Sequence, residues 1–383
     1  MARHYLDHAS TAPPRPEVLE ALREWATVPA ADPGRVHHEA ERVRALVEEA
    51  REHVASLVGV RARQVVFTSG ATEAINAAVW GATRARPGAR VLCAGVEHSA
   101  VRDASARLAP VDEIPVDGVG RIDLDGVARA LSEGAADGPP ALVHCQWANH
   151  EVGTIQPVAE IVERARDAGI PVHVDAAAAC GHLPVRLGEL DADLVSISAH
   201  KLGGPPGVGA LVVRRGIRIE PLLVGGQQER ARRAGMENVP GIMGFGAAAA
   251  ALADGEGALL EAELVRSHRQ TKAILDAALG VDGVRLVGAP LPEDRLPHVV
   301  CLGVEGVEAE PIVLGLDRRG IAVHSGSACS SESLEPSPVL QAMGVDASHS
   351  LRPSVGWSTT DADVEAFVEA FAGVVSDLRR LRL

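Results

Sequence analysis

The sequence predicts an α/β protein with a mostly parallel central sheet flanked by helices and a smaller α+β part near its C-terminus. Short apolar runs alternate with helical or glycine- and proline-rich segments between residues 64 and 213. An amphipathic helix precedes this region, and a long helix followed by short strand-like runs comes after about Gly255. A chain of 383 residues, of which 46% are hydrophobic, can fill a core of this size.

The amphipathic helix extends from Glu41 to Val58. Its apolar residues recur at three- and four-residue spacing, which places them on one face. Gly59 follows directly, where the end of a helix often needs a left-handed backbone. This segment therefore predicts a helix that packs one side against the core.

Six short apolar runs predict the strands of the main sheet. Most are too short for a helix, and they are separated by segments long enough to cross over a parallel sheet. These runs lie at residues 64–67, 91–93, 141–145, 172–174, 194–197 and 209–213.

The region after Gly255 has a different pattern. A long helix is expected to end at Leu279, and a last helix is expected to begin at Asp361. Between them the sequence predicts strands at 298–302 and 321–324 and a helix at 308–319. We expect a large domain over residues 15–254 and a small domain that combines residues 1–14 with residues 255–383.

The composition excludes several classes of protein. The formal net charge of −14 argues against direct nucleic-acid binding, which depends on clusters of Lys and Arg. Aromatic residues make up only 2% of the chain, so stacking platforms for single strands are poorly supplied. The N-terminus lacks the apolar run of a signal peptide, and no stretch approaches the length of a membrane span. We expect neither secretion nor membrane insertion.

The five cysteines form no CxxC pair, and their number is odd. Neither a disulfide framework nor a zinc site is indicated, and a reducing cytoplasm fits best. His37 and His38 beside Glu39 invite a metal interpretation. Adjacent residues at a helix start do not face one point, however, and no fourth ligand is evident. We therefore expect no metal site.

The segment TSGATEAIN, residues 68–76, joins an apolar strand to a helix through small residues. Small residues there let a phosphate group reach free backbone N–H groups at the helix N-terminus, where the helix dipole favours negative charge. Many strand–turn–helix segments with Gly and Ser bind no ligand, so this motif alone leaves both interpretations open.

Two further segments place polar residues after buried strands. PVHVDAAAAC (171–180) has Asp175 at the end of its strand, and SISAHKLGGPPGVG (196–209) has Lys201 after the next strand. Open α/β sheets bind ligands at the carboxyl ends of their strands, and one crossover would bring both residues to that edge. Taken singly, Asp175 fits a helix N-cap equally well, and Lys201 fits a solvated loop.

Taken in order, the motifs of this chain resemble those of the cysteine desulfurases, which are fold-type I pyridoxal-phosphate enzymes of the aminotransferase class V group. The resemblance covers nearly the whole chain and implies the fold of a fold-type I pyridoxal-phosphate-dependent transferase. The subgroup with an SGSAC cysteine loop is the closer match. The motifs are YLDHAS (5–10), TSGATE (68–73), EHSAV (97–101), HVDA (173–176), AHK (199–201), GGQQER (225–230), SGSACSS (325–331) and SLRPSVG (350–356).

The resemblance implies roles for the cofactor-binding residues. Lys201 would hold pyridoxal 5'-phosphate as an imine and remove the Cα proton of the substrate, while Asp175 would pair with the ring nitrogen. His98 would stack on the ring and assist proton transfers. The cofactor phosphate would be held by Thr72, Ser198 and His200 and by the backbone at Ala71.

The resemblance also implies a substrate and a partner. Arg352 would bind the carboxylate of L-cysteine, since its planar guanidinium suits a carboxylate. The thiolate of Cys329 would attack the substrate sulfur, so that alanine is released and a persulfide remains for a protein sulfur acceptor. A homodimer is implied as well.

Three positions near the expected cofactor depart from the family pattern. His150 replaces a common Asn, Ala178 replaces an expected Gln, and Met236 replaces a Thr that in relatives reaches the phosphate of the other subunit. His150 or its neighbour Asn149 would then supply a hydrogen bond at the ring or the substrate. A thioether cannot donate a hydrogen bond, so we expect weaker cofactor retention.

Two alternative functions stay open at this point. Another enzyme on the same scaffold, such as a selenocysteine lyase or a β-eliminating or aminotransferase-like enzyme, would retain Lys201, Asp175 and Arg352 but would not need Cys329. A cofactor-binding regulatory subunit with weak catalysis would retain the cofactor residues alone.

Overall fold

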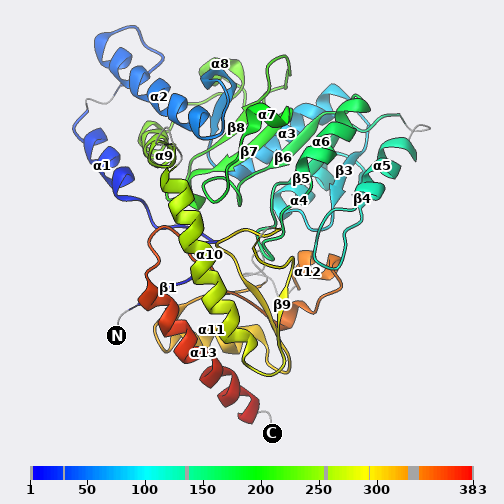
Figure 1. Ribbon diagram of the computed structural model, residues 1–383. Helices are drawn as coiled ribbons and strands as arrows, with labels where there is room; N and C mark the ends of the chain where they lie inside the picture. The colour runs from blue at the N-terminus through cyan, green and yellow to red at the C-terminus, as the bar shows by residue number, and fades with distance from the viewer. Residues whose placement is uncertain are drawn as a thin grey trace.

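The computed structural model describes residues 3–28, 31–133, 138–253, 258–292, 294–326 and 336–381. Its upper part in Figure 1 is a seven-stranded sheet with helices packed around it, and its lower part holds the C-terminal elements together with the N-terminal strand. The long helix α10 (Ala258–Leu279) runs from one part to the other.

The seven-stranded sheet has the order β2-β8-β7-β6-β5-β3-β4, and only β8 runs antiparallel to its neighbours. The mostly parallel sheet predicted from the sequence is therefore confirmed, and all six predicted strands are present within one residue of their expected starts. The strands are β2 (Val65–Thr68), β3 (Val91–Ala94), β4 (Val111–Ile114), β5 (Leu142–Gln146), β6 (Val172–Asp175), β7 (Leu194–Ser198) and β8 (Gly209–Val213).

The edge strand β4 was missed from the sequence. Its residues Val111, Asp112 and Glu113 are exposed, so the strand carries no buried apolar run that could be recognised. Charged residues on an edge strand also discourage pairing with another chain.

Helices cover both faces of this sheet. They are α1 (Pro16–Trp25), α2 (His38–Leu57), α3 (Ala71–Ala85), α4 (Ser99–Leu108), α5 (Leu124–Glu133), α6 (Val158–Asp167), the short α7 (Leu187–Leu190) and α9 (Val239–Leu252). The predicted amphipathic helix is α2, which begins three residues earlier than expected because Nδ1 of His37 accepts the N–H of Ala40 and caps the helix. Gly59 has the expected left-handed backbone, with φ of 68°.

The C-terminal part contains a four-stranded sheet of order β12-β13-β10-β9 and a two-stranded parallel sheet of β1 and β11. Pairing of His4 with Ile321 holds the N-terminal segment in this part. The grouping of residues 1–14 with residues 255–383 as one domain stays a prediction. The remaining elements are β1 (His4–Tyr5), β9 (Val284–Val287), β10 (Cys301–Val304), α11 (Ala309–Asp317), β11 (Ile321–Ala322), β12 (His324–Ser325), α12 (Pro338–Ala342), β13 (Ser350–Arg352) and α13 (Asp361–Leu381).

Two strand predictions in this region need correction. The run 321–324 forms two strands, because β11 pairs with β1 while β12 pairs with β13 of the other sheet. The run 298–302 forms a strand only from Cys301, because Val299 makes an isolated bridge to Ser354 before the ladder with β9 begins. Both apolar runs are buried, but burial alone does not say which strand is the partner.

A left-handed turn follows the GGQQ segment at residues 225–228. Glu229, Arg230 and Ala231, within α8 (Gln228–Ala231), have φ of 47°, 58° and 61°, which costs an L residue about 1 kcal/mol or more each. The Glu229 carboxylate accepts two hydrogen bonds from the buried Arg51 guanidinium, at 2.7 and 2.8 Å, and one from the N–H of Phe67 in β2. The buried ion pair therefore fixes the strained turn against the main sheet.

Replacing Ala231 with Gly should raise the free energy of unfolding by about 1 kcal/mol, because glycine adopts a left-handed backbone without steric cost. Ala231 is exposed, so the change removes little packing. Urea denaturation measures the difference. The matched control is Ala273→Gly at an exposed position of α10, which should lower the free energy of unfolding by about 1 kcal/mol. Equal effects of the two changes would contradict strain at residue 231.

Candidate active site

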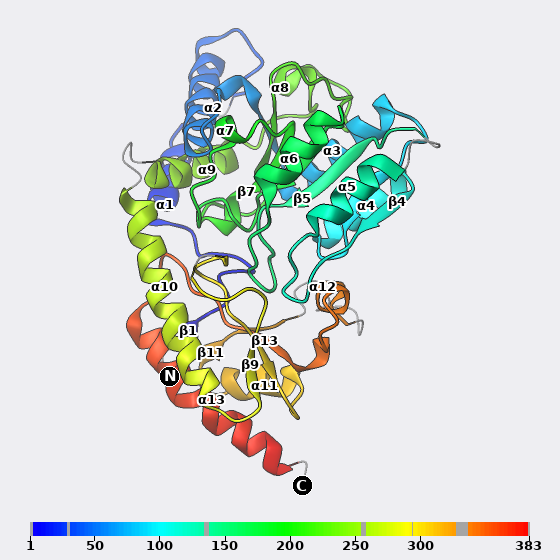
Figure 2. The ribbon, with the colours of Figure 1, turned by 45° about the vertical axis from the view of Figure 1, so that its right-hand side comes forward.

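A cavity of about 450 Å³ lies at the carboxyl ends of β5, β6 and β7. In Figure 2 the loops that follow these strands face the part of the molecule that holds β1 and β13. All but two of the site residues expected from the sequence line this cavity. The expected residues that line it are Ala71, Thr72, His98, His150, Asp175, Ser198, His200, Lys201 and Arg352.

Lys201 ends a short 3₁₀ turn, η2 (Ala199–Lys201), directly after β7. Its Nζ donates hydrogen bonds to the carbonyl oxygens of Ala9, at 2.5 Å, and Ser10, at 3.0 Å. These residues follow β1, so the pairing of β1 with β11 supplies one wall of the cavity. The N-terminal segment is a part of the site whose contacts the sequence did not indicate.

Asp175 is the last residue of β6 and is 8% exposed. Its Oδ1 accepts the hydroxyl of Ser196, at 2.9 Å, and the N–H of Ala177, at 3.1 Å. A turn follows instead of a helix, so Asp175 is not a helix N-cap. The carboxylate is held at the sheet edge by the neighbouring strand β7.

Glu97 is a second buried acid beside Asp175, and no role for it was expected. It is 1% exposed, and its Oε1 accepts the N–H of Gln146 at 2.7 Å. Its Oε2 has no hydrogen-bond partner among the described residues. Burial, and then the negative charge of Asp175, raise the pKa of Glu97 to about 8. Glu97 is therefore mostly protonated at neutral pH.

The imidazoles of His98 and His150 meet edge to face, with ring centroids 4.9 Å apart. His98 is the N-cap of α4, and its Nδ1 accepts the N–H of Ala100 at 3.0 Å. In the neutral ring the proton must then lie on Nε2. Nε2 of His150 lies 3.6 Å from Oε1 of the buried Glu151.

The N-terminus of α3 opens onto the cavity. Its N-cap, Gly70, has no side chain to accept the first backbone N–H groups, which is the arrangement that binds anions at helix ends. A Cβ on Gly209 of β8 would lie 2.7 Å from Gly70, so only glycine fits there. Ser198 and His200 line the same cavity, and burial, followed by the charge of Lys201, lowers the pKa of His200 to about 4.

Glu73 is the one acid in this first turn of α3. Its carboxylate accepts the N–H of Ser69 at 2.8 Å and pairs with Arg233 at 2.9 Å. Arg233 follows the left-handed turn, so that turn supplies a positive charge beside the α3 N-terminus. The Glu73 charge is thereby compensated, and the position stays suited to an anion.

Arg352 is 1% exposed and ends β13. Its guanidinium donates to the carbonyl of His150, at 2.9 Å, and to the hydroxyl of Ser10, at 2.8 Å, and it lies 3.3 Å from Asp7. Its Nε has no hydrogen-bond partner among the described residues. A buried guanidinium with an unused donor at the cavity wall is suited to a carboxylate.

Two expected site residues are not in the cavity lining. Asn149 is fully buried, its amide donates to Val96 and Gln146, and its Oδ1 accepts the N–H groups of Glu151 and Val152. Its side chain shapes the loop and does not reach the cavity. Cys329 lies outside the described residues. Close to the described end of that segment, the Ser337 hydroxyl donates to the Glu151 carboxylate at 2.5 Å.

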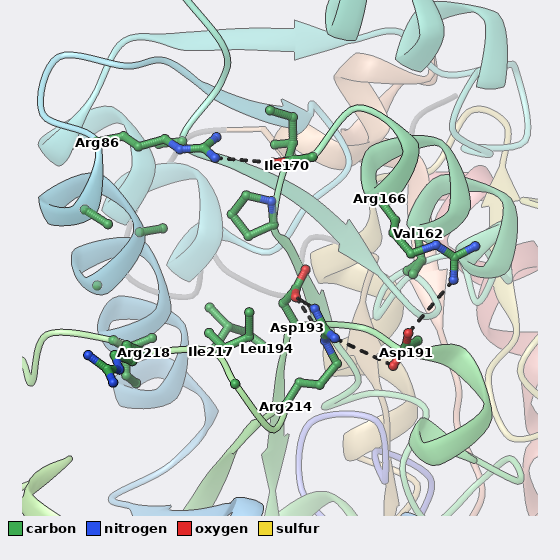
Figure 3. A pocket seen from close by; sticks show the side chains of 18 residues that line it. Arg86, Val162, Arg166, Ile170, Asp191, Asp193, Leu194, Arg214, Ile217 and Arg218 are labelled. Atoms are coloured by element: carbon green, nitrogen blue, oxygen red, sulfur yellow. Dashed lines mark hydrogen bonds and ion pairs between the residues drawn. The ribbon is translucent and has the colours of Figure 1, made fainter.

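A second cavity of about 380 Å³ lies at the amino ends of the strands, on the opposite edge of the sheet. Figure 3 shows Arg214 between Asp193 and Asp191, and Arg166 pointing toward Asp191. None of the expected site residues lines it. Since α/β sheets bind ligands at the carboxyl ends of their strands, the cavity around Lys201 is the candidate active site.

The family model for aminotransferase class V matches residues 4–367. The chain belongs to the aminotransferase class V family. A cysteine desulfurase of Cereibacter sphaeroides is 40% identical over 100% of this chain and 98% of its own length. Cysteine desulfurase IscS 1 of Archaeoglobus fulgidus is 39% identical, covering 98% of each chain. A solved structure of a NifS-like protein superposes with a TM-score of 0.88 at 30% identity, covering 98% of this chain and 100% of that one.

These class V relatives confirm the fold expected from the sequence and the resemblance to cysteine desulfurases. No described helix meets the length and hydropathy that a membrane span requires.

Replacing Glu97 with Gln tests the protonated state of this buried acid. The folded-state pKa of about 8 lies above the ordinary value of 4.5, so the folded protein loses stability as the pH rises through this window. Gln does not titrate, so the variant should gain stability relative to the original chain from about pH 5 to 8, by about 1 kcal/mol per pH unit. Urea denaturation at three pH values measures the gain. The same change at the exposed Glu369 should leave the pH dependence unaltered, and a pH-independent effect of Glu97→Gln would show that Glu97 is ionised in the fold.

Proposed function

We propose that this protein is a pyridoxal-phosphate-dependent cysteine desulfurase that converts L-cysteine to L-alanine and transfers the sulfur to its own Cys329. One observation carries the proposal: Lys201, Asp175 and Arg352 come from three separate strand ends and line the same cavity. The relatives named cysteine desulfurase, which match along the whole chain, support the same activity.

The residues around the cavity fit the cofactor. The uncapped N-terminus of α3 offers backbone N–H groups for its phosphate, with Thr72, Ser198 and His200 beside them. Asp175, held at the end of β6 by its hydrogen bonds to Ser196 and Ala177, would bind the ring nitrogen, and Lys201 would bind the aldehyde carbon. His98 would lie on the ring face, and His150 would reach the ring oxygen that Ala178 cannot. When bound, the cofactor withdraws electrons from the substrate and makes its Cα proton acidic.

The substrate is held by its carboxylate. Arg352 would use its free Nε and one of the donors now shared with Ser10 and Asp7 to bind that group in two places. The Cα carbon would then face Lys201, whose neutral amine takes the proton. The carbonyl oxygens of Ala9 and Ser10 hold the resulting ammonium in place.

Sulfur transfer requires Cys329 as a thiolate. Its sulfur attacks the sulfur of bound cysteine, a new S–S bond forms, and the C–S bond of the substrate breaks. The electron pair of that bond stays with the substrate Cβ, which gains a proton from His98 or Lys201, and Lys201 returns a proton to Cα to give alanine. The persulfide on Cys329 is then passed to a protein acceptor.

The proposal includes a homodimer in the cytoplasm. Apolar side chains near the left-handed turn are exposed, with Val36 at 91%, Val224 at 79% and Met236 at 62%, as a surface covered by a second copy would be. The described cysteines Cys93, Cys145, Cys180 and Cys301 are all free and buried, which suits a reducing compartment.

The sulfur route is tested by Cys329→Ser with Lys201→Ala as its partner variant. Both should abolish alanine formation from cysteine, because each removes an obligatory group. Only Lys201→Ala should also remove the visible absorbance of the bound cofactor. Chromatographic assay of alanine and an absorbance spectrum measure the two effects. Unchanged alanine formation by Cys329→Ser would favour a selenocysteine lyase, and pyruvate in place of alanine would favour a β-eliminating enzyme. A wild-type protein that binds cofactor without turnover would favour a regulatory subunit.

Met236→Thr should strengthen cofactor retention, because its hydroxyl restores a donor that a thioether lacks. We expect about a fivefold lower dissociation constant, the size of one net hydrogen bond. Dialysis against phosphate buffer followed by cofactor assay measures it. Leu314→Thr, an exposed apolar position on α11, is the control and should not alter retention. Equal retention by Met236→Thr and the original chain would remove Met236 from the cofactor site.

A further inference from the structure

Three imidazoles and Lys201 line one small cavity. We call His8, His182 and His298 the histidine cluster. The rings of His182 and His298 stack with centroids 3.6 Å apart and planes 17° apart. His8 and His298 are 1% and 2% exposed. Nothing in the proposed sulfur transfer uses these residues.

A small cavity joins this cluster to the active site. Its volume is about 10 Å³, close to the smallest space that holds one water molecule. It is lined by the three histidines and by four residues that also line the active-site cavity, namely Ala9, His150, Ala178 and Lys201. It is therefore an inner annex of that cavity.

Ring nitrogens in the cluster remain available for a water molecule. Nδ1 of His8 and Nδ1 of His298 are buried and have no hydrogen-bond partner among the described residues. Buried polar atoms in native proteins are generally satisfied by protein groups or by water. An annex of this size next to such nitrogens is a polar site for one water molecule.

The imidazoles of the cluster are neutral. Burial lowers the pKa of His8 and His182 to about 4 and that of His298 well below its usual value. A neutral imidazole accepts a proton at one nitrogen and gives one from the other. Nε2 of His182 lies 3.1 Å from the carbonyl oxygen of Lys201, so that nitrogen carries the proton. The other titratable and charged groups that act on the cluster are His150, Lys201, Arg15, Arg352, Asp7 and Asp363.

The cluster reaches the surface through His8. Its Nε2 lies 3.4 Å from the hydroxyl of Ser358, which is partly exposed. Lys201, His298 and His8 thus line the same annex, and Ser358 lies beyond His8 on the C-terminal part.

We propose that a water molecule in the annex and the histidine cluster form a proton path between Lys201 and solvent. The proton leaves Nζ of Lys201 for the water, which gives a proton to one nitrogen of His298. A proton leaves the ring for His8, and Nε2 of His8 releases one through Ser358. Passage in the other direction restores the starting tautomers. The inference rests on the proposed function of Lys201 as a base, and the histidines are positioning residues that act through it.

The path is tested in turnover by His298→Asn and His8→Asn, because asparagine is polar and of similar size but does not take up a proton. Each variant should form alanine about tenfold more slowly, a modest share of what proton transfer contributes in enzymes. The solvent deuterium isotope effect on kcat should rise while KM stays unchanged. Leu296→Met, an apolar change in the same annex wall, should leave the isotope effect as it is. Wild-type rates and isotope effects in both histidine variants would overturn the path.

A second measurement does not depend on turnover. In cofactor-free protein with ¹⁵N-labelled histidine, the ring nitrogen shifts of His298 should follow the titration of Lys201 between pH 6 and 10. In Lys201→Met this change should be absent. A wild-type protein that forms no alanine would refute the proposed function, and the titration would still decide the path: ring shifts that are identical in the original chain and Lys201→Met would overturn it.

Discussion

The register of β5, β6 and β7 is the constraint on which the site depends. Gln146 pairs with Asp175, and Asp175 pairs with Ser196 on the next strand, so the polar ends of three strands lie side by side. Parallel pairing brings carboxyl ends to one edge of the sheet, and a shift by one residue would turn Asp175 to the opposite face. These strands are buried on both faces, as is usual for a parallel sheet covered by helices.

Burial at this edge of the sheet shifts the pKa values of neighbouring groups. Burial and the charge of Asp175 raise the pKa of Glu97 to about 8, whereas the Asp175 carboxylate accepts hydrogen bonds from Ser196 and Ala177. The histidines are likewise held neutral by burial, while the guanidinium of Arg352 has neutral and acidic oxygen partners. Each group is thus kept in the charge state that its proposed role requires, at a cost in folding stability that the surrounding apolar core must offset.

The N-terminal segment links the two parts of the molecule at the site. β1 pairs with β11, Ala9 and Ser10 then hold the Lys201 amine, and Arg15 donates to Leu202 and forms an ion pair with Glu263 on α10. Trp357 donates to Pro13 on the same segment. Lys201 is therefore held between the main sheet and the C-terminal part, and the position of its amine depends on both.

The sequence by itself determined six strands of the main sheet and the helix α2, and it singled out nine of the residues that line the cavity. These features are encoded locally, by runs of buried apolar residues and by short motifs after them. It did not determine β4, the division of 321–324 between two sheets, or the separation of Asn149 from the cavity, because each depends on a partner distant in the chain. The sequence also did not determine the surroundings of Glu97, Ser10 and the histidine cluster. Their chemistry comes from burial and from unsatisfied neighbours, and only the packing of segments remote in sequence creates those conditions.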